Sequence, residues 1–96
     1  MQKTTVRIPQ ISSIETALKL YYQKTELNNS EIRELFGEIS NATIWRLKRL
    51  AKEKMVERDI PSWNAQCVNT TAAYVAWGLD IEDLEHRYKK LKEISA

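Results

Sequence analysis

Residues 29–54 read NSEIRELFGEISNATIWRLKRLAKEK, and this stretch predicts one helix before a glycine and a second helix after it. Before the glycine, polar capping residues precede an apolar stripe of Ile32, Leu35 and Phe36. Gly37 stands where a helix commonly ends in a left-handed residue. The pattern predicts a short helix that closes at this glycine.

A longer, basic helix is expected after the glycine, from about residue 40 to residue 54, with Ser40 and Asn41 as its capping residues. One face holds apolar residues at helical spacing: Ile44, Leu47, Leu50 and Ala51. The opposite face holds aromatic and basic residues: Trp45, Arg46, Arg49 and Lys52, with Lys48 at its edge. The spacing therefore predicts a helix with one buried side and one cationic side.

The charge of the chain is unevenly distributed, although the formal net charge is only +2. Residues 40–58 carry six basic side chains against two acidic ones, a local charge of +4, whereas residues 29–39 carry −2. A polyanion would be drawn to the basic side of such a molecule. Charge alone is equally consistent with a helix face that is merely solvated.

Upstream of these two helices, residues 1–11 are expected to form an extended arm or a short strand. Ser12 and Glu15 are spaced as a capping box for a first helix over about residues 13–24. The apolar residues of this helix again recur on one side.

Downstream, alternating polarity predicts a strand over residues 55–60, and residues 65–68 could return as the second strand of a hairpin. A further helix is expected from about residue 70 to Gly78, and Asp80 can cap a last helix. No repeat or linker divides the chain, so a single domain is expected.

The composition excludes several classes of protein. The 96 residues are 43% hydrophobic and contain two glycines, two prolines and one cysteine, so disorder, a collagen-like chain and a disulfide framework are not expected. The sequence has no apolar run that could span a membrane and no secretory signal pattern. We expect a soluble cytoplasmic domain.

The central stretch resembles the helix-turn-helix of bacterial and phage regulators. In that family a leucine, a hydrophobic residue and a glycine close the first helix, as do Leu35-Phe36-Gly37 here. The family pattern of hydrophobic, Ser, x, Ala, Thr, hydrophobic, x, Arg then matches residues 39–46 (ISNATIWR). Glu38 lengthens the turn by one residue compared with the tightest form of the motif.

The continuation over residues 50–58 (LAKEKMVER) resembles the start of the wing in winged helix-turn-helix proteins. Lys54 and Met55 stand where that family commonly has a glycine before its hydrophobic residue. The resemblance covers about residues 12–68. It implies a tri-helical helix-turn-helix core with a short β-hairpin wing. The C-terminal third resembles no known family, and its capping residues and periodicity predict two further helices. We therefore expect a mainly α protein that forms one domain over residues 1–96.

The resemblance implies sequence-specific binding of double-stranded DNA, with the helix over residues 40–54 in the major groove. Its N-terminal half would reach base edges through Asn41, Thr43, Trp45 and Arg46. Phosphate contacts would come from the cap, the later basic residues and the wing: Ser40, Lys48, Arg49, Lys52, Arg58, Ser62 and Asn64. The expected role is that of a small transcriptional regulator or an accessory factor of a phage or mobile element.

The alternative is a winged-helix module that binds another protein, such as a phage or conjugation scaffold or an anti-repressor. RNA binding is less favoured because the sequence predicts no sheet platform of aromatic residues. No small-molecule ligand is indicated.

The C-terminal third holds large apolar residues that could pack on the first helix or form a homodimer: Tyr74, Trp77, Ile81, Leu84, Tyr88 and Leu91. A dimer would let two recognition helices meet successive major-groove faces about 34 Å apart on a palindromic site. The sequence leaves packing and dimerisation as equal alternatives.

No catalytic or metal site is expected. His86 is the only histidine and lies among charged residues, and Cys67 has no base near it in sequence. Asp80 and Asp83 suit helix capping better than acid–base chemistry. We expect neither an enzyme nor a cofactor.

Overall fold

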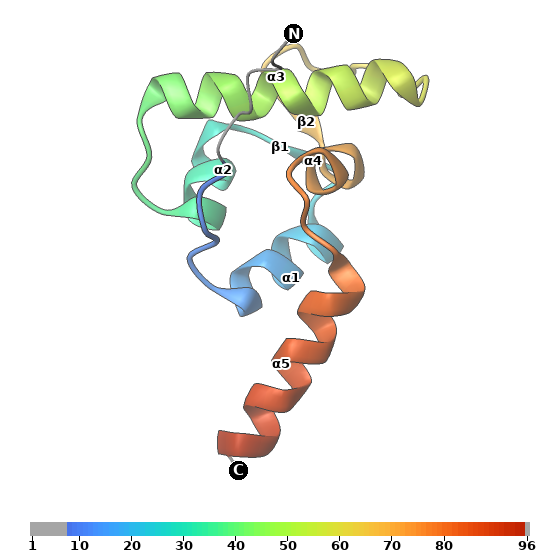
Figure 1. Ribbon diagram of the computed structural model, residues 1–96. Helices are drawn as coiled ribbons and strands as arrows, with labels where there is room; N and C mark the ends of the chain where they lie inside the picture. Colours follow the sequence, from blue (N-terminus) through green and yellow to red (C-terminus); the bar gives the residue numbers. More distant parts are fainter. Residues whose placement is uncertain (1–7, 96) are drawn as a thin grey trace, which may run out of the picture.

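The computed structural model describes residues 8–95, with the backbone alone described for Ser95. This part of the chain folds into five helices and two very short strands (Figure 1). In chain order the elements are α1 (Ile14–Gln23), β1 (Glu26–Leu27), α2 (Asn29–Phe36), α3 (Asn41–Glu57), β2 (Val68–Asn69), α4 (Thr70–Ala76) and α5 (Ile81–Ser95). The prediction of a mainly α fold with a small antiparallel sheet is confirmed.

The N-terminal arm lies mostly outside the described residues, because placement begins at Ile8. Residues 8–11 have no regular secondary structure, and Ile8 and Ile11 pack half-buried against the core.

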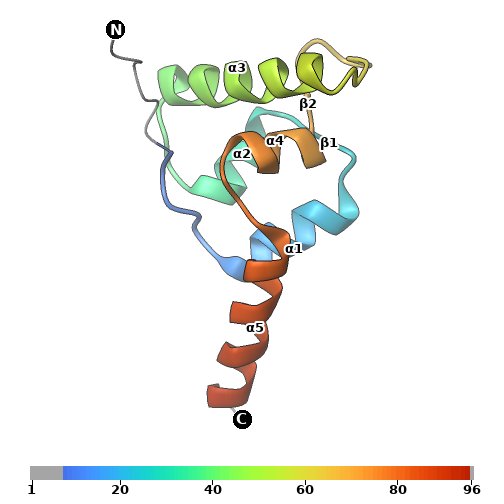
Figure 2. The same ribbon diagram turned by 45° about the vertical axis from the view of Figure 1, so that its right-hand side comes forward.

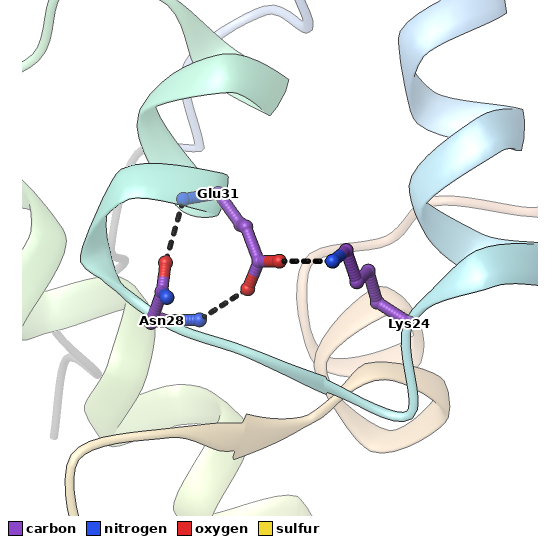
Figure 3. A network of polar contacts seen from close by, with 3 residues as sticks. All are labelled: Lys24, Asn28 and Glu31. Carbon is purple, nitrogen blue, oxygen red and sulfur yellow. Dashed lines mark hydrogen bonds and ion pairs between the residues drawn. The ribbon is translucent and has the colours of Figure 1, made fainter.

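The start of α2 is fixed by the predicted polar residues. The Asn28 side chain accepts a hydrogen bond from the Glu31 backbone N–H, and the Glu31 carboxylate accepts one from the Asn28 N–H, both at 2.9 Å. Figure 3 shows that the second carboxylate oxygen of Glu31 also meets the Lys24 ammonium, at 3.3 Å. This capping box therefore joins the start of α2 to the residue that follows α1.

The start of α1 differs from the prediction by one residue. Ser13, not Ser12, is the N-cap, and its hydroxyl accepts from the Thr16 N–H. The Ser12 hydroxyl instead donates to the Glu34 carbonyl at 2.7 Å. The predicted capping box of Ser12 and Glu15 is wrong because free carbonyls at the end of α2 bind Ser12.

The short helix α4 ties the core together. Its Trp77 cap residue donates from the indole N–H to the Leu47 carbonyl of α3 at 2.8 Å, and its Tyr74 hydroxyl donates to the Ala17 carbonyl of α1. Both side chains are buried, and the Trp77 ring meets that of Phe36 edge-on. One buried cluster includes residues from all five helices and both strands. Gly78 closes α4 with a positive φ of 73°, as predicted.

The two strands are not those of the predicted hairpin. β1 and β2 pair antiparallel with Glu26 opposite Asn69 and Leu27 opposite Val68. Residues 55–57, predicted to begin a strand, instead continue α3, because Met55 extends its buried stripe.

The end of α3 has a Schellman motif in which Asp59 adopts the left-handed conformation, with φ 55°. The Ile60 N–H donates to the Met55 carbonyl at 2.9 Å, and the Asp59 N–H donates to the Val56 carbonyl. Residues 58–67, here called the 58–67 loop, then lead to β2.

The molecule is elongated. Its radius of gyration is 13.9 Å, against roughly 12.5 Å expected for a compact chain of this length. Figures 1 and 2 show why: α3 lies across one end of the molecule, and α5 extends away from α1 at the other. The surfaces of these two helices are therefore far apart.

Candidate nucleic-acid interface

The long helix α3 has the two-sided character that the sequence predicts. The apolar side chains of Ile44, Leu47, Ala51 and Met55 are buried in the core. On the opposite side Trp45, Arg46 and Arg49 are exposed, with the Trp45 side chain 62% accessible. The C-terminal helices thus complete the core without covering these three residues.

Polar contacts occupy the first turn of α3. The Ser40 hydroxyl accepts from the Thr43 N–H at 3.1 Å and lies 3.0 Å from the Thr43 hydroxyl. The Asn41 side-chain oxygen accepts from the Arg33 guanidinium of α2. The bond between Arg33 and Asn41 joins α2 to α3, and it leaves the two amide hydrogens of Asn41 as side-chain donors.

Trp45 and Arg49 form the centre of the exposed face. The Arg49 guanidinium lies over the Trp45 ring, 5.3 Å from its centroid, one helical turn away. The same guanidinium is 4.0 Å from the Glu53 carboxylate, a loose and exposed ion pair. A shallow groove of about 360 Å³ runs along these side chains to Val56.

Lys48 and Lys52 hold the 58–67 loop against α3. The Lys48 ammonium donates to the Gln66 carbonyl at 2.7 Å and to the Asn29 side-chain oxygen at 3.0 Å. The Lys52 ammonium donates to the Ala65 carbonyl at 2.8 Å. Partial burial lowers the pKa of the Lys48 ammonium from its ordinary value, and the charge of Lys52 adds to the effect. Lys48 and Lys52, which the sequence predicts as phosphate contacts, therefore also hold the 58–67 loop in place.

The predicted contacts of the wing lie on the 58–67 loop rather than on a hairpin. Arg58 caps α3, and Ser62 and Asn64 are exposed farther along. The Asn64 side-chain oxygen accepts from the Gln66 N–H at 2.9 Å and so shapes the turn. The carbonyls of this turn are those that bind Lys48 and Lys52.

Two further apolar side chains are exposed, Val56 on α3 and Trp63 on the 58–67 loop, and the sequence pattern predicts no role for either. Val56 and Trp63 are 78% and 81% accessible, among the most exposed large apolar side chains of the described residues. The sequence pattern did not identify Asn29 and Gln66, which position Lys48, or Arg33, which positions Asn41. The acceptors for Lys48 and Lys52 are mostly backbone carbonyls, which leave no mark in the sequence.

Three of the six predicted dimer residues belong to the core of the chain. Tyr74, Trp77 and Leu84 are at most 7% accessible, so they are not available to a second copy. The other three remain at least partly accessible: Ile81, Tyr88 and Leu91.

Among residues 8–95, no group of three or more His, Cys, Asp or Glu side chains is placed to hold a metal ion. No helix in this part of the chain combines the length and apolar character needed to cross a membrane. No family model matches the chain, and no curated protein or solved structure matches it significantly.

Proposed function

We propose that this chain binds double-stranded DNA sequence-specifically, with α3 in the major groove, as a small transcriptional regulator or an accessory factor of a phage or mobile element. The observation that carries the proposal is the exposed face of α3. Trp45, Arg46 and Arg49 project from a helix whose other side is anchored in the core. An α-helix fits the major groove, and arginine can donate two hydrogen bonds to guanine.

Within this face, the contacts favour particular roles. Arg46 is exposed and lies on the second turn, where recognition helices reach base edges. Asn41 keeps free amide donors for a base or a phosphate, whereas Thr43 shares a hydrogen bond with the Ser40 cap. We therefore assign sequence reading first to Arg46 and then to Asn41.

Phosphate binding is assigned first to Arg49 and then to Lys48 and Lys52. Arg49 has a loose ion pair and a contact with the exposed Trp45 ring, whereas each lysine already donates to carbonyls of the 58–67 loop. A phosphate near the loop would share these ammonium groups, each of which has three donors. With a DNA phosphate at this position, the loop residues Arg58, Ser62 and Asn64 would lie beside the same DNA backbone.

A second candidate function is protein binding through the same face. It is favoured by the exposed apolar side chains of Trp45 and Val56 on α3 and of Trp63 on the neighbouring 58–67 loop, because binding to phosphates requires no exposed apolar side chain. The salt dependence of binding separates the two candidates, because neutralising phosphates releases counterions and contact with an apolar protein surface does not.

The test is a titration with duplexes selected from a random pool, followed by fluorescence anisotropy at several salt concentrations. Arg46→Ala should weaken binding to the selected duplex by about 1–3 kcal/mol and relax the preference at one base pair. Arg49→Ala should weaken all duplexes alike and reduce the salt slope by about one unit. Arg87→Ala, which removes an exposed arginine from α5, is the matched control and should change neither quantity. Wild-type binding without salt dependence, or variants that bind like wild type, would refute the proposal.

A further inference from the structure

The outer half of α5 has apolar side chains that the rest of the described chain leaves uncovered. Leu84, near the start of the helix, is buried against the core, whereas Leu91 and Ile94 are 51% and 80% accessible. Figure 2 shows this end of α5 projecting away from the other helices. A groove of about 600 Å³ separates the start of α1 from the side chains of Tyr88 and Leu91.

The charges of α5 are divided between its two halves. The acidic residues lie mainly in the first half: Asp80 at the cap, then Glu82, Asp83 and Glu85. The basic residues lie in the second half: Arg87, Lys89, Lys90 and Lys92, with Glu93 as the exception. Such a helix is complementary in charge to a second copy of itself that runs in the opposite direction. A parallel copy would instead place like charges side by side.

We infer that the outer half of α5 is a homodimer surface, at which two α5 helices pair antiparallel about a two-fold axis near Tyr88. Leu91 and Ile94 of each copy would lie along the first half of the partner's α5, level with positions 85 and 82, so that one symmetric contact covers both exposed pairs. The basic second half of each helix would lie beside the acidic first half of its partner.

The contact is expected to be weak. Two helices of 15 residues each form a small interface, at the low end of the about 1,200–2,000 Å² that stable complexes bury. Self-association should therefore appear at tens to hundreds of micromolar. The inference is independent of the proposed function, because α3 lies at the other end of the molecule (Figure 1).

Sedimentation velocity of the full chain from 5 to 500 µM tests the surface. The wild type should shift from one chain to two across this range, and a single-chain mass throughout would overturn the inference. Leu91→Glu combined with Ile94→Glu should raise the dissociation constant at least tenfold, because it places four carboxylates in the contact. Both positions are exposed, so circular dichroism should show an unchanged fold.

The control is Val75→Glu, a single change from an apolar residue to glutamate at an exposed position of α4. It should leave self-association unchanged. A dimer that survives the double variant, or that Val75→Glu dissociates equally well, would place the contact elsewhere. Binding of a monomeric wild type to anionic lipid vesicles, lost in the double variant, would assign the surface to a membrane instead.

A distance measurement tests the antiparallel orientation. A spin label at Glu82→Cys, in a Cys67→Ser background, lies six residues from the two-fold axis. Antiparallel pairing separates the two labels by about 18 Å along the helix axis, whereas parallel pairing gives no axial separation and leaves only about 10 Å between helices. A mean distance of 20 Å or more supports the inference, and a shorter one refutes the antiparallel orientation.

Discussion

Replacing Trp77 by phenylalanine tests whether α4 holds α3 in place. The indole N–H donates to the Leu47 carbonyl at 2.8 Å, and the side chain is only 2% accessible. Loss of this hydrogen bond costs about 1 kcal/mol. The smaller ring also leaves space beside Phe36, which adds about 1–2 kcal/mol. The free energy of unfolding should therefore fall by about 2–3 kcal/mol.

Thermal and urea unfolding, followed by circular dichroism at 222 nm, measure this loss. A change of 2–3 kcal/mol corresponds to a decrease in Tm of about 10–20 °C for a chain of this size. The matched control is Trp45→Phe, the same chemical change at an exposed position of α3. Its cost should stay within about 0.5 kcal/mol. Equal unfolding midpoints for the two variants would refute the assignment of Trp77 as the link between α4 and α3.

Three other variants test separate parts of the structure. Burial raises the pKa of the Tyr74 hydroxyl, so this hydroxyl ionises at a lower pH in the unfolded chain than in the folded one. The free energy of unfolding should therefore fall by about 1.4 kcal/mol per pH unit above about pH 10. Urea titrations should show that Tyr74→Phe removes this part of the slope. Asn28→Ala should cost about 1 kcal/mol in the same assay, because it removes the cap of α2, and a neutral effect would contradict that role. Lys48→Met should speed hydrogen exchange several-fold in residues 64–67 and leave α1 unchanged, since it releases the 58–67 loop; uniform exchange rates would count against the anchor.

The helix boundaries were predictable where they depend on local chemistry. Polar residues cap α2 as predicted, through the capping box of Asn28 and Glu31, Ser40 caps α3, and Gly78 closes α4. Each signal lies within a few residues of the backbone groups that it satisfies, so one stretch of sequence contains the whole interaction.

The strands could not be predicted in the same way. Leu27 pairs with Val68, and two residues a side give no alternating pattern to detect. The pattern at Met55 is ambiguous, because this residue begins an alternating stretch and also lies four residues after Ala51. Burial in the core decided in favour of the helix.

The candidate site was predictable in part. Periodicity placed Trp45, Arg46 and Arg49 opposite the apolar stripe, and all three are exposed. It could not show that Lys48 and Lys52 bind loop carbonyls, because any residue supplies a backbone carbonyl.

The placement of α3 and α5 at opposite ends limits how two copies could share DNA. One chain is 45 Å long, whereas successive major-groove faces of one duplex are only about 34 Å apart. Two chains joined through α5 would hold their α3 helices farther apart than that and facing outward. Such a pair would not suit adjacent half-sites of a palindrome, and it would instead bridge two separate duplexes or close a loop between distant sites.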